Sequence, residues 1–467
     1  MFDKKKFINK FENDKSYWYV HQSSILNNEE RIIFELEFFR KLSGKIWNVK
    51  TQTAFRKELS KFNIADNRKK TKSNEQDLNA LVRGIKSKMQ TLGLLWVEEG
   101  SKISITSTGE RFFRNQDFKE IVEHQLWKYI FYNPSMRKKI YHDTLLIPHA
   151  FLCQVLIEIE ENYITHDEYI LFVCKADTHE DLKVVLNEIR QWRKLDSTKQ
   201  EEVLSRLKEL KSSTRGNSLY QKIKTNKPYA LGFFTNTTYL SNDDQEIRII
   251  KNKKNIIKEK LEELKNNFSL IEFANVEDWI DFYGDYNKKY TSTEALEYYE
   301  SKASNKKYKN KAISFYTKNQ YLRNSLNKEE YEKKLDHEIR MHKYYAEFPD
   351  QIEPGSGLKL VENGFKYQTK EAGEIDLLCK NKNGFVIVEL KRNKSSDKTI
   401  GQTLRYIGWV KENLCKDKKT NVRGIILSRS SEKKITFAIN ALPKNLISFY
   451  ETPFDVTPKL IDHNKRN

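Results

Sequence analysis

The stretch EIDLLCKNKNGFVIVELKR, residues 374–392, decides the fold of the C-terminal part of this chain. Two runs rich in apolar and β-branched residues flank Asn383-Gly384, a pair that favours a tight hairpin turn. Successive side chains of a strand point to opposite faces of a sheet. One face of the predicted hairpin therefore carries an apolar set that can pack as a core: Leu377, Cys379, Val386, Val388 and Leu390.

The opposite face of this hairpin carries Asp376, Glu389 and Lys391. A two-residue turn at Asn383-Gly384 sets Asp376 opposite Lys391, whereas a four-residue loop sets Asp376 opposite Glu389. Both registers bring the two carboxylates and the lysine to one side. The bland alternative is a solvated hairpin with an Asp–Lys cross-strand pair.

These three residue types suit the hydrolysis of a phosphodiester. Carboxylate oxygens suit Mg²⁺, which keeps several waters and takes the rest of its shell from substrate phosphate. The metal neutralises phosphodiester charge and lowers the pKa of a bound water. Lys391 can position or deprotonate the attacking water and stabilise the developing charge.

The segments around the hairpin extend the pattern. Residues 395–414 have helical apolar spacing, and Gln402 and Tyr406, four residues apart, share one face of that helix. Glu338 lies in a helical run upstream. Further downstream the sequence predicts a strand, a helix and a strand at 424–429, 433–441 and 445–450. This order predicts an αβββαβ core.

The C-terminal part resembles the PD-(D/E)XK nuclease superfamily, in particular its NucS-like branch. The resemblance rests on IEPG (352–355), GEIDLL (373–378), VIVELKR (386–392) and GQTLRYIGWV (401–410). It implies that the acid, the acid-x-Lys and the Gln-x-x-x-Tyr patterns form one active site.

By this resemblance Asp376 and Glu389 bind Mg²⁺, for which Mn²⁺ can substitute, and Lys391 is catalytic. Gln402 and Tyr406 support the site. The family also has a glutamate on the preceding helix, for which Glu338 is the candidate and Glu332 the fallback.

The N-terminal half contains two successions of helix and β-rich sequence. Residues 77–92 have a helical apolar stripe, and short β-rich runs follow at 94–99 and 102–107, joined through Gly100. A helix followed by a hairpin is the order of a winged-helix unit, which can place the helix in a DNA groove. We therefore expect such a unit at about 20–115.

The second succession suggests another unit of this kind. Its segments are a helix at 199–212, an extended run at 227–240, a β-like run at 246–251 and a charged helix from 254. We expect a second winged-helix-like unit at about 195–267, with packed helices such as 151–176 between the two.

This region resembles the recognition halves of type II restriction enzymes of the AlwI kind. The resemblance rests on LVRGIKSKMQTLGLL (81–95), SITSTGERFF (104–113) and YITHDEYILFV (163–173). It implies that the N-terminal region reads double-stranded DNA.

The domain organisation follows from one polar stretch. Residues 302–312, KASNKKYKNKA, lack apolar periodicity and are typical of a linker. We expect a DNA-recognition region at 1–285, a linker at 286–325 and a nuclease domain at 326–467. The overall class is an α+β or α/β multidomain protein with a mostly helical N-terminal half.

Composition narrows the classes of function. The formal net charge of +19 favours a polyanionic partner, unless it reflects only a lysine-rich coding bias. No stretch approaches the ~18 apolar residues of a membrane span. The four cysteines form no CxxC pair, which argues against a disulfide framework or a zinc site. We expect a cytoplasmic protein without a membrane partner.

The sequence thus predicts a type II-like restriction endonuclease that hydrolyses double-stranded DNA with Mg²⁺ and cuts outside the recognised site. Cutting the second strand then needs a homodimer, sequential nicking or a partner subunit, and a cognate methyltransferase protects host DNA. A NucS-like repair endonuclease acting on mismatched or branched DNA is one alternative. A non-catalytic DNA-binding protein with a nuclease fold is another, and the complete acid–acid–Lys set argues against it.

Overall fold

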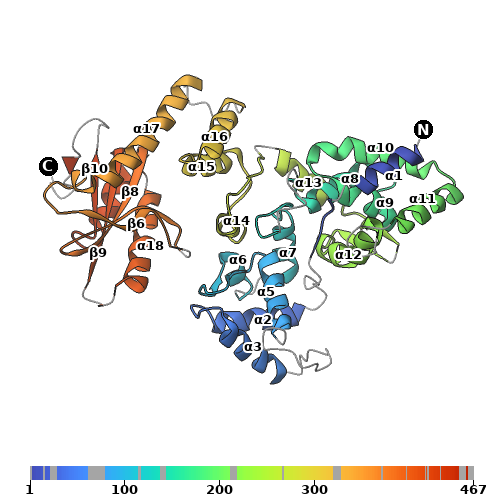
Figure 1. Cartoon of the computed structure of the whole chain (residues 1–467), viewed down its shortest axis with the longest axis horizontal. Coiled ribbons are helices and arrows are strands. Elements are labelled where there is room, and N and C mark those ends of the chain that lie inside the picture. The colour runs from blue at the N-terminus through green and yellow to red at the C-terminus, as the bar shows by residue number, and fades with distance from the viewer. Residues whose placement is uncertain are drawn as a thin grey trace. The chain divides into compact units, whose positions relative to one another are not determined.

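A computed structural model provides the fold of this chain. It describes residues 3–13, 16–20, 29–61, 79–113, 117–136, 144–210, 218–243, 245–265, 268–318, 328–369, 372–395, 397–415, 417, 420–431, 433–451 and 459–460. The chain divides into two compact units, Met1–Ala295 and Leu296–Asn467 (Figure 1).

The C-terminal unit is built around a mixed sheet. Its described strands follow the order β11-β10-β9-β8-β7-β6. β6, β7 and β8 are successive antiparallel neighbours, whereas β9 runs parallel to both β8 and β10. The strands are β6 (Lys359–Gln368), β7 (Glu374–Asn381), β8 (Gly384–Ser395), β9 (Asn421–Ser431), β10 (Ile447–Glu451) and β11 (Lys459–Leu460).

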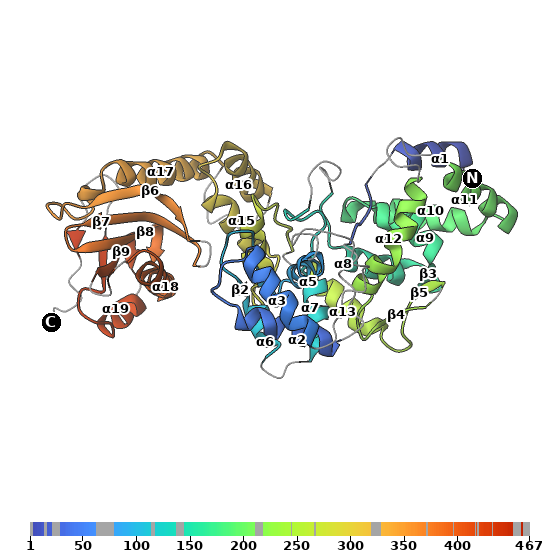
Figure 2. The ribbon, with the colours of Figure 1, turned by 60° about the horizontal axis from the view of Figure 1, so that its bottom comes forward.

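Helices cover both faces of this sheet (Figure 2). α17 (Lys328–Glu347) lies on one face, and α18 (Asp397–Asn413) and α19 (Lys433–Asn440) lie on the other. The order of helices and strands predicted for this part of the chain is therefore confirmed. A short 3₁₀ turn, Pro349–Gln351, connects α17 to the sheet.

The hairpin residues divide between two cores as the alternation predicts. The α18 side holds Leu378 and Ile387, packed with Ile407 of the helix. Burial of both faces explains why the paired stretches Leu377–Cys379 and Phe385–Val388 are apolar without alternation. The α17 side holds Met341 and Tyr345 of the helix together with all five residues of the predicted apolar face: Leu377, Cys379, Val386, Val388 and Leu390.

The region predicted to be a linker, 286–325, contains helices on both sides of a turn at 302–305. α15 (Ser292–Ser301) and α16 (Lys306–Lys318) lie in this region. The buried residues of α16 are Tyr308, Ala312 and Tyr316, which lie four apart on one helical face. Because lysines lie between these residues, the sequence alone shows no clear apolar periodicity here. The boundary between the two compact units nevertheless falls within 286–325.

The N-terminal unit contains the first predicted helix-and-hairpin succession. α5 (Ala80–Thr91) buries Val82, Ile85 and Met89, and the short strands β1 (Leu95–Trp96) and β2 (Ser104–Ile105) pair antiparallel after it. α2 (Glu29–Lys41) and α3 (Val49–Lys61) precede this succession, and α6 (Ser107–Arg111) and α7 (Phe118–Leu126) follow it.

The second succession differs from its prediction. α12 (Leu219–Phe234) includes most of the run that was predicted to be extended. Ser218 starts this helix, because its hydroxyl accepts from the Gln221 backbone while the Gln221 side chain reaches back in a capping box. Phe233 and Phe234 are fully buried, so tertiary packing outweighs their preference for strands.

A small antiparallel sheet follows α12. Its described strands have the order β3-β5-β4, with β3 (Tyr163–Thr165), β4 (Leu240–Asn242) and β5 (Glu246–Ile249). β3 interrupts the 151–176 segment, which was predicted to be helical throughout. The other elements of this unit are α1 (Lys4–Asn13), α8 (Pro148–Glu158), α9 (His166–Leu171), the 3₁₀ turns Val173–Lys175 and His179–Asp181, α10 (Leu182–Arg193), α11 (Ser197–Glu209), α13 (Lys254–Lys265) and α14 (Val276–Tyr283).

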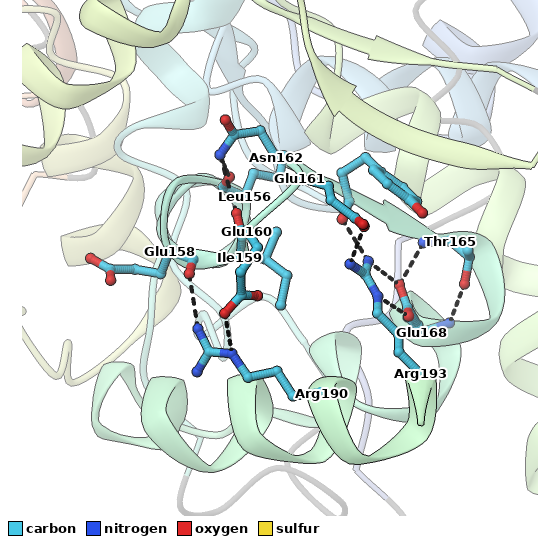
Figure 3. Close-up of polar contacts among 11 residues, drawn as sticks. Leu156, Glu158, Ile159, Glu160, Glu161, Asn162, Thr165, Glu168, Arg190 and Arg193 are labelled. Carbon is cyan, nitrogen blue, oxygen red and sulfur yellow. Dashed lines mark hydrogen bonds and ion pairs between the residues drawn. The ribbon is translucent and has the colours of Figure 1, made fainter. Parts of the chain in front are cut away.

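Arginines of α10 hold the corner between α8 and α9 (Figure 3). Arg193 donates from Nε and Nη2 to the two carboxylate oxygens of buried Glu168, at 2.7 and 2.9 Å. Arg190 Nε donates to Glu160 Oε1 at 2.7 Å. A two-pronged arginine–carboxylate pair fixes direction as well as distance, so these contacts orient α10 against β3 and α9.

Among the described helices, none has the length and apolarity needed to cross a lipid bilayer.

Candidate active site

The β7–β8 register brings the three predicted residues to the end of a strand ladder. Pairing runs from Asn381↔Gly384 to Leu377↔Val388. Continuing this register sets Asp376 opposite Glu389, which is the second of the two predicted alternatives. Just past the last pair, the Leu390 backbone amide donates to Asp376 Oδ2 at 2.8 Å. This bond fixes one carboxylate oxygen and leaves Oδ1 for other partners.

Glu389 is buried beside a cation and a second carboxylate. It is 1% exposed, and its Oε1 accepts from Lys391 Nζ at 2.6 Å. Burial, followed by the Asp376 charge, raises the pKa of Glu389 well above its ordinary value, although Lys391 opposes this shift. Burial lowers the pKa of Lys391, but the Glu389 and Asp376 charges outweigh it and leave that pKa raised. The cluster therefore carries an excess of negative charge that another cation would neutralise.

One oxygen in this cluster has no described partner. Glu389 Oε2 is buried and accepts no hydrogen bond from the described residues. A buried carboxylate oxygen without a partner is costly, so its presence calls for a ligand that the described residues do not supply. A hard divalent cation fits, because Asp376 and Glu389 offer oxygen ligands. No group of three or more metal-ligating side chains is found among the described residues, so the other ligands would be water and phosphate or a side chain outside them.

Gln402 and Tyr406 are neighbours on one face of α18, as their spacing predicted. Gln402 Nε2 donates to the Tyr406 hydroxyl at 2.9 Å, and that hydroxyl donates to the Glu374 carbonyl at 2.7 Å. Tyr406 is buried, and burial raises its pKa to about 12, so it is a neutral donor at physiological pH. The pair ties α18 to β7 two residues before Asp376, which is a positioning arrangement.

The two candidate glutamates of α17 differ in what the structure describes of them. Glu338 lies on α17, but its side chain is outside the described residues. Glu332 lies further toward the start of α17 and forms an ion pair with Lys328 at 3.8 Å. Ile339 and His342 of α17 line the same cleft as Asp376. The backbone thus places residue 338 one helical turn before His342, at the level of the site.

The IEPG turn has a structural role. Glu353 within it forms an ion pair with Arg423 and accepts from the Tyr450 hydroxyl at 2.6 Å. These contacts tie the connection between α17 and β6 to β9 and β10, and so hold α17 against the sheet.

A cleft of about 320 Å³ opens beside the carboxylates. Asp376, Leu390 and Lys391 lie on the sheet side of it. Residues of α15, of the turn after it and of α17 form the helical sides: Glu297, Glu300, Ser301, Ser304, Leu335, Ile339, His342 and Lys343. Phe365 and Lys366 of β6 and Glu374 of β7 complete the lining.

Sequence reasoning missed His342 and the α15 side of this cleft. His342 is one helical turn beyond Glu338, so the spacing along α17 could have indicated it. α15 was missed because it lies in the region that was taken to be a linker. Lys366 Nζ holds α15 to β6 by donating to the Ser301 carbonyl at 2.7 Å.

Two carboxylates and a lysine at the end of a ladder, within a mixed sheet between helices, define a PD-(D/E)XK nuclease. Comparisons with known proteins agree. A family model described as the C-terminal domain of endonuclease NucS matches residues 337–443, and one described as AlwI restriction endonuclease matches residues 90–383. The second match spans more than half of the chain, which therefore belongs to the AlwI restriction endonuclease family.

Individual relatives match only a part of this chain. Endonuclease NucS of Methanocaldococcus jannaschii is 40% identical over 76 residues, which cover 15% of this chain and 28% of that protein. A repair endonuclease from Pyrococcus abyssi is 27% identical, with a TM-score of 0.20, over 24% of this chain and 45% of that one. EndoMS in a complex with double-stranded DNA is 25% identical, with a TM-score of 0.20, over 26% and 44%. This chain thus covers less than half the length of each of these relatives.

Proposed function

We propose that this chain is a type II-like restriction endonuclease that hydrolyses double-stranded DNA with Mg²⁺. The observation that carries this proposal is the buried oxygen of Glu389 that has no partner among the described residues, beside Asp376 and Lys391, which line an open cleft. Structural ion pairs satisfy their carboxylates, whereas this one leaves an oxygen for a cation. Membership in the AlwI family supports the choice of DNA as the substrate.

The residues of the site have separate tasks in this proposal. Asp376 and Glu389 would hold Mg²⁺, and each keeps one oxygen, Asp376 Oδ1 and Glu389 Oε2, that the Leu390 amide and Lys391 leave open. When bound, the metal neutralises phosphate charge and makes a water more acidic. Lys391, whose pKa is raised by the Glu389 and Asp376 charges in the metal-free protein, would orient the attacking water and stabilise developing negative charge.

Gln402, Tyr406 and Glu338 act around this centre. The Gln402–Tyr406 pair holds β7 in place through the Glu374 carbonyl. Glu338 is proposed to complete the site from α17. The arrangement leaves the cleft side of Asp376 and Lys391 open to a DNA strand.

The N-terminal unit is proposed to recognise the DNA sequence. Its α5 helix and the β1–β2 pair have the succession that a winged-helix reader needs, and the net charge of +19 supports binding to a polyanion. The region 1–285 would read DNA and the part from 326 would cut it, outside the recognised site. The second strand would be cut by a second copy, by sequential nicking or with a partner subunit, and a cognate methyltransferase would protect host DNA.

A NucS-like repair activity is the second candidate, and the match of residues 337–443 to NucS favours it. Digestion of sequenced plasmid DNA with Mg²⁺, followed by sequencing of the ends, separates the two. A restriction enzyme gives ends at a fixed distance from one short sequence. A repair enzyme leaves perfectly paired plasmid intact and cuts a mismatched or branched duplex. No cleavage of either DNA with Mg²⁺ or Mn²⁺ would contradict both.

A further inference from the structure

We propose that His342 is a positioning residue of the active site, which orients the open oxygen of Asp376 through one bridging water for cation binding. This inference rests on the proposed function, because it assigns a residue that prepares the same metal site.

The position of His342 relative to Asp376 is the first observation. His342 Nδ1 lies 4.0 Å from Asp376 Oδ1, the oxygen that the Leu390 amide does not hold. This separation is too long for a direct hydrogen bond. It is within the span of two hydrogen bonds that meet at one water, and both residues line the cleft that gives water access.

The second observation is the burial of a polar ring at this position. His342 is 9% exposed, and its other ring nitrogen, Nε2, is buried without a described hydrogen-bond partner. Next to it on α17, Met341 packs into the core, as does Tyr345. An apolar side chain would fill this place without leaving a buried nitrogen unsatisfied. A structural role in packing therefore does not explain the imidazole.

The chemistry of the pair fixes one of the two hydrogen bonds. An ionised carboxylate only accepts, so the water must donate one proton to Asp376 Oδ1. Toward His342 Nδ1 the water accepts from an N–H or donates its second proton, according to the tautomer of the imidazole. One bond to the Leu390 amide leaves the Asp376 carboxylate free to twist about that bond. The water on Oδ1 removes this freedom.

Glu389 needs no such help. Lys391 holds its Oε1 directly at 2.6 Å, and burial restricts the rest of the side chain. The two proposed metal ligands are thus oriented in different ways: Glu389 by a direct ion pair, and Asp376 by a backbone amide together with His342. Partners of this kind are typically worth about 10–100-fold in metal affinity or activity.

The test compares side chains at position 342 in the full-length protein. His342→Leu removes both nitrogens and keeps an apolar filling, and His342→Phe does the same with a ring. His342→Asn keeps a hydrogen-bonding amide near the place of Nδ1. Ile339→Val, one turn earlier in the same cleft lining, is the matched control because it changes packing without removing a polar atom.

Two quantities are measured for each variant. The Mn²⁺ affinity of the DNA-free protein is determined from the electron paramagnetic resonance signal of free Mn²⁺, and the melting temperature is the second quantity. We expect His342→Leu or His342→Phe, whichever keeps the wild-type melting temperature, to lose about tenfold or more in Mn²⁺ affinity. His342→Asn should recover most of that loss, and Ile339→Val should bind as wild type. DNA affinity in EDTA should be the same for all variants.

Wild-type Mn²⁺ affinity in both apolar variants would overturn the role of His342 while leaving the proposed function intact. Equal losses in Ile339→Val and the apolar variants would also overturn it, since packing would then be the cause. Equal losses in His342→Asn and the apolar variants would overturn the bridging water. A wild-type protein that binds no Mn²⁺ and cuts no DNA would instead contradict the proposed function, and this inference with it.

Discussion

Two buried glutamate–lysine pairs, one in each unit, differ in what surrounds them. Glu35 of α2 is fully buried, and its Oε2 lies 2.5 Å from Lys88 of α5. Its other oxygen accepts from Arg31 Nε at 2.9 Å, so both oxygens meet cations. Glu389 is equally buried and meets Lys391 at 2.6 Å, but its other oxygen has no described partner and Asp376 lies beside it.

This difference separates a structural ion pair from a site that is prepared for a ligand. Around Glu35, one carboxylate meets two cations and is satisfied by the protein alone. Around Glu389, two carboxylates meet one lysine, so the described residues carry a charge that they do not neutralise. Burying such charge is expensive, and the cost is recovered when a cation binds. We therefore propose that the pair with the open oxygen is the functional one.

The largest effect on cleavage is expected at Lys391, the lysine of the pair whose glutamate has an open oxygen. Lys391→Ala should lower the rate of DNA cleavage by about 10²–10⁴-fold, because a positioned cation no longer acts on the reacting phosphate. DNA binding in EDTA should change little, since the ammonium faces the cleft, whereas the melting temperature should fall, because buried Glu389 loses the cation on its Oε1. Cleavage under single-turnover conditions is the measurement. A wild-type rate would mean that the reaction takes place elsewhere.

Lys88, the lysine of the pair whose glutamate oxygens both have cationic partners, should instead affect stability. Lys88→Ala removes one partner of a fully buried carboxylate and should cost about 3–5 kcal/mol in the free energy of unfolding. Urea denaturation measures it. The control is the double variant Glu35→Leu/Lys88→Met, which removes both charges and should recover much of the loss. A single variant as stable as wild type would contradict the description of this pair as structural.

Replacing Glu389 or Glu35 by glutamine should change the free energy of unfolding in opposite directions. In the metal-free protein, Glu389→Gln removes a buried charge that lacks a described partner on one oxygen and should raise the free energy of unfolding by about 1–3 kcal/mol. Glu35→Gln should lower it, because Arg31 and Lys88 lose their anionic partner. Denaturation in EDTA compares the two. Destabilisation by both substitutions would remove the distinction between the pairs.

The smallest effect concerns α15, which sequence reasoning placed in a linker. Tyr331 of α17 donates from its hydroxyl to Glu300 Oε1 of α15 at 2.7 Å. Tyr331→Phe should lower the stability of the C-terminal unit by about 1 kcal/mol, since one hydrogen bond to a carboxylate is lost. Hydrogen exchange of α15 amides is the measurement. Unchanged exchange would favour a loosely attached helix over a fixed side of the cleft.

The sequence was most informative where its pattern was local. The alternation from Leu377 to Leu390 predicted the hairpin and its buried face correctly, and the spacing of Gln402 and Tyr406 predicted that they are neighbours on one helix face. The register was left between two alternatives, because turn residues alone do not fix which pair closes the hairpin.

What the sequence did not reveal depended on tertiary packing. The helical stripe of α16 consists of Tyr308, Ala312 and Tyr316 among lysines, so its apolar character appears only when the tyrosines are buried. Phenylalanine prefers strands, but Phe233 and Phe234 are helical here because both side chains pack into the core. His342 has no motif of its own, and only its distance to Asp376 connects it to the site.

The central claim is that Asp376 and Glu389 hold the metal and Lys391 acts beside it, and one measurement tests it most directly. Cleavage of plasmid DNA is followed over a Mg²⁺ titration for wild type, Asp376→Asn and Lys391→Ala. Replacing a carboxylate oxygen by an amide weakens the metal site, so Asp376→Asn should need more Mg²⁺ and regain part of its activity at high concentration. Lys391→Ala should stay inactive at every concentration, and EDTA should abolish wild-type cleavage. Cleavage by both variants with the wild-type Mg²⁺ dependence, or wild-type cleavage in EDTA, would contradict the account.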